Sequence, residues 1–147
     1  MTRGYLALGS NLGDRAAYLA AARRLLAGKQ VRLIRESSVQ ETEPFGVEDQ
    51  PAFLNQVLEV EWKGTPRELL QIVKAVEAEA GRRPSFRWGP RELDVDILLL
   101  GSEHVAEPDL TIPHPGLADR PFLRQLLGEL VELGELEGPL DGRALGR

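Results

Sequence analysis

The sequence contains no cysteine, which excludes disulfide bonds and thiolate chemistry. It also contains no apolar run that approaches the roughly 20 residues of a membrane-spanning helix. The apolar stretch near its first residue is too short for a signal peptide. We therefore expect a cytoplasmic protein that has no membrane partner.

An excess of positive charge is also missing. The formal net charge is −5 at pH 7, whereas a general nucleic-acid binder needs a net positive surface to meet the phosphate backbone. The sequence therefore predicts no nucleic-acid partner, although a local basic patch could still bind a small polyanion.

Apolar residues, by contrast, are plentiful enough for one core. They make up 42% of the 147 residues, and a chain of this length fits one domain. The sequence has no linker, repeat or low-complexity segment. We predict a single domain over residues 1–147 that acts as a monomer.

Hydrophobic periodicity predicts strands over residues 4–8, 31–41, 53–62 and 93–100, and helices over residues 14–29, 65–81 and 119–133. The clearest boundary is at Thr65, which begins a capping box that ends at Glu68 and has Pro66 at the first helical position. Two strand–helix–strand halves followed by a late helix predict an α+β, ferredoxin-like fold. In this fold an antiparallel sheet has helices packed on one face, here with an extra C-terminal helix.

Residues 82–91 form an arginine-rich segment inside an acidic chain. The segment has four arginines and no acidic residue: Arg82, Arg83, Arg87 and Arg91. Guanidinium groups offer paired N–H donors to phosphate oxygens, so the segment suits a polyphosphate. The alternative is a solvated charge run, but the interleaved Phe86 and Trp88 favour a binding function.

Asp94 and Asp96 follow this segment directly, on a predicted strand. The strand period of two places both carboxylates on one face, opposite a core face formed by Leu93, Val95, Ile97 and Leu99. Two carboxylates side by side repel each other unless a cation lies between them, and Mg²⁺ prefers carboxylate and phosphate oxygens. The alternative is that each aspartate pairs with a nearby arginine.

Three further side chains are weaker candidates. His114 lies between two prolines that hold it in extended backbone, which makes a functional role about as expected as a packing role. Phe53 and Asn55 share a strand face and together suit a flat heteroaromatic ligand, although Phe53 alone is typical of a core. Glu77 lies off the apolar stripe of its helix, and its position alone predicts a solvated side chain.

Several ordered motifs make the chain similar to the hydroxymethyl-dihydropterin pyrophosphokinases of folate biosynthesis over residues 5–127. The most specific are Arg87-Trp88-Gly89-Pro90-Arg91 and Leu93-Asp94-Val95-Asp96-Ile97. Supporting motifs occur in the same order as in the family: Leu8-Gly9-Ser10-Asn11-Leu12-Gly13, Thr42 through Pro44 to Gly46, Asp49-Gln50-Pro51, Phe53-Leu54-Asn55 and Pro113-His114.

The resemblance implies a ferredoxin-like fold and a reaction in which ATP gives its β,γ-diphosphate to the alcohol of a reduced pterin, releasing AMP. It implies that Asp94 and Asp96 hold two Mg²⁺ ions and act with Arg82 and Arg91 in catalysis. Residues implied for the pterin pocket are Thr42, Pro44, Phe53, Asn55 and Phe122, with Trp88 on a loop that closes over the substrates. Residues implied for the nucleotide are Glu77, Arg82, Arg83, Arg91, His114 and Arg120.

This sequence departs from the family pattern in three places. The arginine segment is one residue shorter than in the best-known members, which affects the match of Arg83. Pro115 stands where some members have a tyrosine, and the C-terminal end is short.

Two other functions are open to the same residues. A nucleotide-sugar glycosyltransferase or other nucleotidyl transferase could use the Asp94/Asp96 pair, although this chain is short for a nucleotide domain plus an acceptor domain. A small-molecule-binding regulatory module could share the sheet topology, but it would not need paired aspartates beside four arginines.

Overall fold

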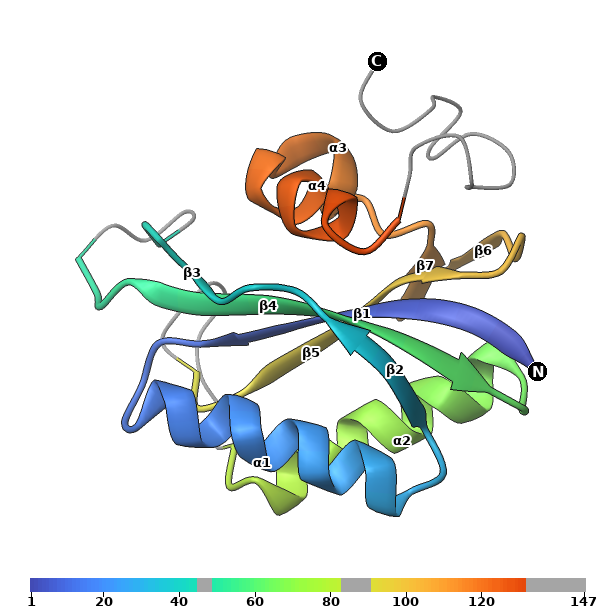
Figure 1. Cartoon of the computed structure of the whole chain (residues 1–147), viewed down its shortest axis with the longest axis horizontal. Helices are drawn as coiled ribbons and strands as arrows, with labels where there is room; N and C mark the ends of the chain where they lie inside the picture. The colour runs from blue at the N-terminus through green and yellow to red at the C-terminus, as the bar shows by residue number, and fades with distance from the viewer. Residues whose placement is uncertain (45–48, 83–90, 132–147) are drawn as a thin grey trace.

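The computed structural model describes residues 1–44, 49–82 and 91–131. Within these residues an antiparallel sheet separates two helical layers (Figure 1). The elements in chain order are β1 (Thr2–Ser10), α1 (Arg15–Gly28), β2 (Arg32–Glu36), β3 (Gln40–Thr42), β4 (Phe53–Trp62), α2 (Pro66–Glu79), β5 (Asp94–Leu100), β6 (Val105–Glu107), β7 (Leu110–Ile112), α3 (Gly116–Asp119) and α4 (Pro121–Gly128).

The main sheet has the order β2-β4-β1-β5, and β3 pairs with β4 beyond the end of β2. Every pairing is antiparallel. With α1 and α2 as the two crossovers, this is the ferredoxin-like arrangement predicted from the order of elements. The two central strands, β1 and β4, are also the longest.

One face of the sheet is covered by α1 and α2 (Figure 1). Asp14 caps α1 by accepting from the Ala17 N–H, and Thr65 and Glu68 form the predicted capping box of α2. The apolar stripes of both helices pack on the even-numbered residues of β1 and β4, such as Leu6 and Leu58. Local capping and periodicity therefore account for this layer.

The opposite face is covered by α3 and α4, where the prediction of one helix over residues 119–133 was wrong. Asp119 ends α3 instead of capping the next helix, and α4 ends at Gly128. Arg120 lies between them in extended backbone (φ −122°, ψ 95°), because the residue before a proline disfavours the helical conformation and Pro121 can only begin a helix. Leu123 and Leu126 are buried against the sheet, and Phe122 is partly buried.

Two strand predictions also needed correction. Residues 31–41 form two strands, and the break between them is at Ser37, whose hydroxyl accepts from the Val57 N–H in place of a ladder carbonyl (2.8 Å). In β5 the register shifts so that Ile97 pairs with Leu6 and Leu99 with Tyr5. Leu99 therefore packs with the α4 layer and not on the same face as Val95.

The hairpin of β6 and β7 was not predicted as a pair, because strands of three residues are too short to show an alternating pattern. It lies beside the end of β5, close to α2.

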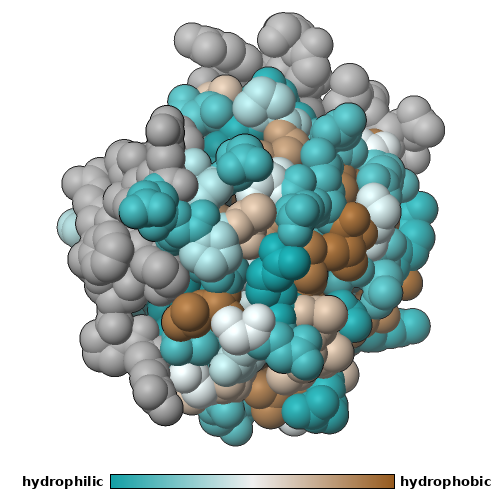
Figure 2. Space-filling view, turned by 90° about the vertical axis from the view of Figure 1, so that its left-hand side faces the viewer, coloured by the Kyte–Doolittle hydropathy of each residue, from teal (hydrophilic) through white to brown (hydrophobic). Residues whose placement is uncertain are grey.

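In the part of the chain that the structure describes, no helix is long and apolar enough to cross a membrane. Figure 2 shows a mostly hydrophilic surface on which hydrophobic side chains form small, separate patches.

Candidate active site

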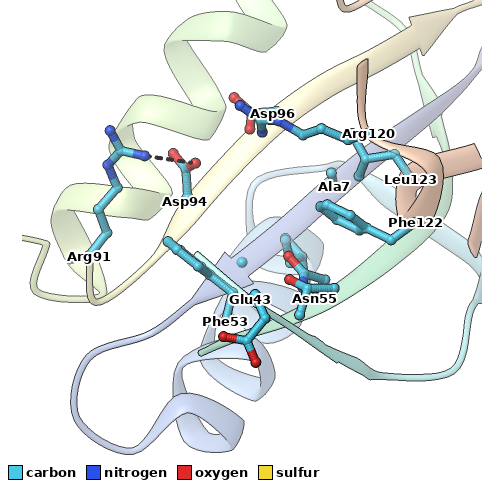
Figure 3. Close-up of a pocket in the computed structure, with 13 residues that line it drawn as sticks. Ala7, Glu43, Phe53, Asn55, Arg91, Asp94, Asp96, Arg120, Phe122 and Leu123 are labelled. Atoms are coloured by element: carbon cyan, nitrogen blue, oxygen red, sulfur yellow. Dashed lines mark hydrogen bonds and ion pairs between the residues drawn. The ribbon is translucent and has the colours of Figure 1, made fainter. Parts of the chain in front are cut away.

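A small cavity of about 70 Å³ lies between the sheet and α4 (Figure 3). It is lined by Ala7, Leu8, Gly9, Thr42, Glu43, Phe53, Asn55, Arg91, Asp94, Asp96, Arg120, Phe122 and Leu123. Phe53 comes from β4 and Phe122 from α4, so the two rings reach the cavity from different layers. Four residues predicted for a pterin pocket, Thr42, Phe53, Asn55 and Phe122, thus line one space, which we call the aromatic cavity.

Asn55 is held in one orientation at the floor of the aromatic cavity. Its side-chain N–H groups donate to the Thr42 hydroxyl (2.7 Å) and to the Gln40 carbonyl (3.2 Å), and the residue is only 7% exposed. These bonds tie β4 to β3 and direct the amide oxygen toward Gly9. The amide is therefore ordered before any ligand binds.

Gly9 is a site residue that the sequence showed only as part of the motif over residues 8–13. It lies in β1, paired with Asn55 on one side and Asp94 on the other. A Cβ atom added here would lie 3.6 Å from Asn55 Oδ1 and 3.7 Å from a Phe53 ring carbon. The missing side chain leaves the floor of the cavity open between the amide and the carboxylate. Pro44, also predicted for this pocket, is buried and does not line the cavity.

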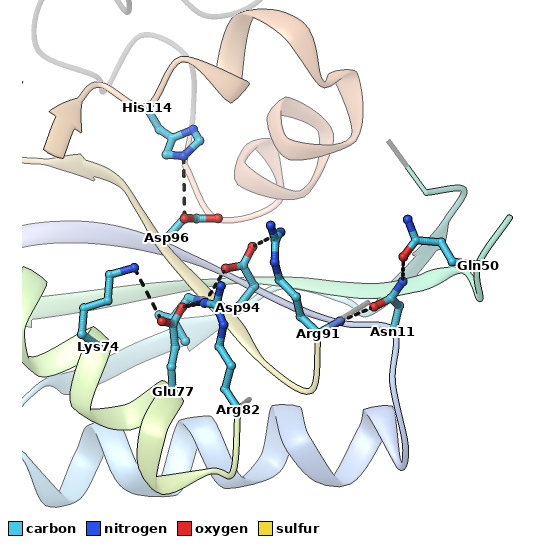
Figure 4. Close-up of polar contacts among 10 residues, drawn as sticks. Asn11, Gln50, Lys74, Glu77, Arg82, Arg91, Asp94, Asp96 and His114 are labelled. Atoms are coloured by element: carbon cyan, nitrogen blue, oxygen red, sulfur yellow. Dashed lines mark hydrogen bonds and ion pairs between the residues drawn. The ribbon is translucent and has the colours of Figure 1, made fainter. Parts of the chain in front are cut away.

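Asp94 and Asp96 both line the aromatic cavity, as their spacing predicted, but their partners differ (Figure 4). Arg82 Nη1 donates to Asp94 Oδ1 (3.2 Å), and Arg91 Nη1 lies 3.6 Å from Asp94 Oδ2. Asp94 therefore pairs with arginines, which was the alternative to cation binding that the sequence left open. Asp96 instead faces His114, whose Nε2 lies 3.8 Å from Asp96 Oδ1.

The charge of Asp96 is poorly compensated in the absence of a ligand. Burial first, and then the negative charges of Asp94 and Glu77, raise the pKa of Asp96 to about 8, although Arg120 and Lys74 oppose this rise. Figure 3 shows the Arg120 side chain extending toward Asp96. A cation placed against Asp96 would favour the ionised carboxylate and so oppose this rise.

Glu77 was expected to be solvated, and this expectation was wrong. It is only 4% exposed, because its carboxylate lies against the start of β5. Its carboxylate accepts from the Val95 N–H (2.8 Å) and pairs with Arg82 (2.8 Å). Burial raises the pKa of Glu77 above its ordinary value, with these two contacts opposing the rise. Glu77 thereby links Arg82 to the strand that carries both aspartates.

A second cavity, of about 240 Å³, lies on the other side of Asp96, between α2 and the β6–β7 hairpin. It is lined by Leu70, Val73, Lys74, Val95, Asp96, Ile97, Pro108, Asp109, Leu110, Thr111, His114 and Pro115. We call it the α2 cavity. Among the residues lining the two cavities, Asp96 is the one that they share.

The residues predicted for a nucleotide are divided between these cavities. His114 lines the α2 cavity, whereas Arg91 and Arg120 line the aromatic cavity. Glu77 and Arg82 lie at the junction, in contact with Lys74 and Asp94. Lys74, Asp109 and Thr111 were not predicted; they are separated in sequence and carry no motif that would have singled them out.

Residues 5–132 match the family model of 7,8-dihydro-6-hydroxymethylpterin-pyrophosphokinase. The chain belongs to this family.

Named relatives agree over most of the chain. A 2-amino-4-hydroxy-6-hydroxymethyldihydropteridine pyrophosphokinase from Bacillus subtilis is 42% identical over 134 residues, which are 90% of this chain and 80% of that protein. One from Aquifex aeolicus is 43% identical over 122 residues, 83% of this chain and 76% of the relative. A mitochondrial folate synthesis bifunctional protein from Pisum sativum is 40% identical over 131 residues, which are 86% of this chain but 25% of that longer protein.

In this pyrophosphokinase Asn11 connects the aspartate strand to the aromatic cavity. Its Oδ1 accepts from the Arg91 N–H (2.8 Å) and its own N–H donates to the Arg91 carbonyl (3.1 Å). Its side-chain amide donates to Gln50 Oε1 (2.8 Å) and to the Pro51 carbonyl (3.0 Å). Asn11 is 1% exposed, so three chain segments are joined through one buried amide.

The donor set of the pyrophosphokinase suits a magnesium ion that also binds phosphate. Within the described ranges no cluster of three or more carboxylate or histidine side chains could enclose a metal. Two partly exposed carboxylates are nevertheless enough for Mg²⁺, which keeps several waters and takes further oxygens from a phosphate substrate. Arg83 and Trp88, predicted for the nucleotide and the pterin, lie outside the described residues.

Proposed function

We propose that this chain transfers the β,γ-diphosphate of ATP to the hydroxymethyl group of 6-hydroxymethyl-7,8-dihydropterin, releasing AMP, as a step of folate biosynthesis. Membership of the pyrophosphokinase family supports the reaction. The observation that carries the assignment of the site is that two chemically different cavities meet at one carboxylate, Asp96.

The aromatic cavity suits the pterin. The ring would stack between Phe53 and Phe122, which reach the cavity from β4 and α4. Asn55 and Thr42 would recognise its polar edge, since their mutual hydrogen bond already fixes the amide. A hydroxymethyl arm directed away from β3 would then point toward Asp94 and Asp96.

The α2 cavity suits the nucleotide, with the phosphates at the end where Asp96 and His114 lie. Arg82 and Arg91 already contact Asp94, and both are placed to exchange that contact for phosphate oxygens. Arg120 lies on the pterin side of the same carboxylates. Glu77 holds Arg82 in position through their ion pair.

Asp94 and Asp96 would hold Mg²⁺, two ions by the family resemblance. When bound, Mg²⁺ supplies positive charge to the phosphate oxygens of ATP. The raised pKa of Asp96 supports this assignment, because a carboxylate whose charge is disfavoured in the empty site gains most from a cation.

The chemistry then depends on position and charge more than on covalent catalysis. The pterin hydroxyl oxygen attacks the β-phosphorus in line, the bond from that phosphorus to the oxygen that bridges it to the α-phosphorus breaks, and AMP leaves with that oxygen. The hydroxyl proton is released to solvent, and none of the described side chains is assigned as a general base. Arg82 and Arg91 offset the charge that develops, and His114 contacts the phosphates near the leaving AMP.

We also propose that one copy of the chain, as a single domain, is sufficient. Both cavities and both aspartates come from the same chain, so a second copy is not needed to complete the site.

The decisive experiment is incubation with ATP, Mg²⁺ and the pterin alcohol, with AMP and pterin diphosphate measured together. Equal amounts of both products, dependent on the pterin and abolished by a chelator, are expected. A glycosyl or nucleotidyl transferase would give no pterin diphosphate, and a regulatory module would bind nucleotide without releasing AMP; either result would refute the proposal.

A further inference from the structure

An ion-pair cluster is built around Asp109, one of the residues that line the α2 cavity. Arg67 Nη1 donates to Asp109 Oδ2 (2.7 Å) and Arg67 Nη2 donates to Asp109 Oδ1 (3.0 Å), which is a two-bond fork. Arg67 also pairs with Glu107. Arg67 lies in the first turn of α2, and Asp109 lies in the turn between β6 and β7. The fork therefore ties the hairpin to the start of α2.

The direction of α2 separates this cluster from the metal-binding end of the site. Arg67 and Glu77 are ten residues apart on one helix, which corresponds to about 15 Å. Glu77 is bonded to the start of β5, beside the two aspartates. A nucleotide with its phosphates at Asp96 would therefore extend its nucleoside part toward Asp109.

The negative charge of Asp109 favours the same orientation of the nucleotide in the α2 cavity. Arg67 holds the pKa of Asp109 below its ordinary value, so the carboxyl group is ionised. An ionised carboxylate that holds no metal ion repels phosphates, and Asp109 is not one of the two aspartates assigned to Mg²⁺, so its charge favours a position away from the phosphates. The apolar lining of the cavity, which includes Leu70, Val73 and Ile97, is suited to the base.

Asp109 is at the rim, since its side chain is 62% exposed. The part of a nucleotide that stays near solvent when its base is buried is the sugar. Each carboxylate oxygen accepts one bond from Arg67 and has a further lone pair to offer. Two fixed acceptor oxygens match the two adjacent hydroxyl groups of a ribose.

We propose that Asp109, held in position by Arg67, accepts hydrogen bonds from the ribose hydroxyls and makes the site selective for ribonucleotides over deoxyribonucleotides. This inference rests on the proposed function, because it assumes that the α2 cavity holds the nucleotide. Asp109 is the specificity residue, and Arg67 is a positioning residue.

The test combines changes in the nucleotide with changes in the protein. The dissociation constants of ATP, 2′-deoxy-ATP and 3′-deoxy-ATP are measured by calorimetry with Mg²⁺, for the unchanged chain and for Asp109→Ala. We expect the unchanged chain to bind ATP about tenfold more tightly than at least one deoxy analogue. In Asp109→Ala this ratio should fall to about one, since the acceptor is gone.

Glu107→Ala is the matched control, because it removes the other carboxylate that pairs with Arg67 but does not line the cavity. Its ATP to deoxy-ATP ratio should equal that of the unchanged chain. Arg67→Met should lower the ratio only in part. Equal binding of ATP and both deoxy analogues by the unchanged chain, or a ratio that persists in Asp109→Ala, would overturn the inference. Release of AMP by the unchanged chain in either case would leave the proposed function intact.

Discussion

Asp96 lines both cavities, so in the proposed reaction this single carboxylate is subject to two constraints. In the protein without a ligand, burial and the charges of Asp94 and Glu77 disfavour the ionised form of the Asp96 carboxyl group. It must also be ionised to hold a cation. A bound cation would offset the unfavourable negative charge of Asp96, and this offset would add to the affinity for the cation.

Asp96→Asn tests this balance, since the amide keeps the shape and removes the charge. AMP formation should fall at least about 100-fold, because an essential cation ligand is lost. Without Mg²⁺ at pH 8 the variant should melt no lower than the unchanged chain. The direction of this effect follows from the raised pKa of Asp96. A carboxyl group whose pKa is higher in the folded protein than in the unfolded chain stabilises the fold at low pH, and this contribution is lost as the pH rises through the folded-state value. Near-normal turnover at ordinary Mg²⁺ would contradict the metal assignment.

Asn55 offers a test of how the cavities divide the substrates. Its amide is bonded to β3 and faces the aromatic cavity, and it does not line the α2 cavity. Asn55→Ala should weaken pterin binding by about 1–3 kcal/mol and leave ATP binding nearly unchanged. Calorimetry with each ligand separately checks this. Equal losses for both ligands would remove Asn55 from the pterin site.

At the scale of elements, the site is assembled where strand ends meet. Asn11 directly follows β1, and it is bonded both to residues 50–51 before β4 and to Arg91 before β5. The sequence showed Asn11 only as part of the motif over residues 8–13. Its buried amide instead sets the position of Arg91 relative to Asp94.

Asn11→Ala should therefore affect catalysis from a distance. Loss of its side-chain bonds should cost about 1–3 kcal/mol of stability per buried partner left unsatisfied. Because the Arg91 N–H would lose its acceptor and Arg91 would be held less firmly, kcat should fall more than KM for either substrate rises. Denaturant unfolding and steady-state AMP assays measure the two effects. Asn11→Asp, which keeps the acceptor for the Arg91 N–H, should recover part of kcat; if it recovers none, the bond to Arg91 is not the cause.

At the scale of the whole molecule, the sheet carries a buried acid that supports the fold and lies outside both cavity linings. Glu59 is 1% exposed and accepts from the Tyr5 hydroxyl (2.7 Å) and from Arg35 Nε (2.7 Å). Arg35 also bonds to the Leu130 carbonyl, beyond α4. One carboxylate thus links β1, β2 and β4, and through Arg35 it reaches the helical layer that carries Phe122.

Glu59 should make a measurable part of the stability depend on pH. Although burial opposes the effect, hydrogen bonds from Arg35 and Tyr5 hold the pKa of Glu59 below its ordinary value of 4.5. A lowered carboxyl pKa contributes stability above the unfolded pKa, and this contribution is lost as pH falls through the folded value. Glu59→Gln should cost about 1–3 kcal/mol at pH 7 and much less near pH 3. Thermal melts of both proteins between pH 3 and 7 test this, and a cost that stays constant with pH would contradict it.

The sequence by itself determined the ferredoxin-like order of elements, the capping of α1 and α2, and the shared face of Asp94 and Asp96. Each of these depends on residues within one element or directly beside it. A capping box acts over one helical turn, and strand alternation needs only neighbours. The aromatic cavity was also foreseeable in its main residues, because Phe53 and Asn55 lie on one strand face.

Only the tertiary structure decided which face Leu99 occupies, where Glu77 is buried, and that the cavities meet at Asp96. Leu99 changes sides because β5 shifts its register against β1, a strand far away in the sequence. Glu77 is buried because β5 supplies an N–H for its carboxylate. Asp109 joins the α2 cavity because Arg67, 42 residues earlier, holds its hairpin there. These outcomes depend on pairing between distant segments, and such pairing leaves no periodic signal within any one of them.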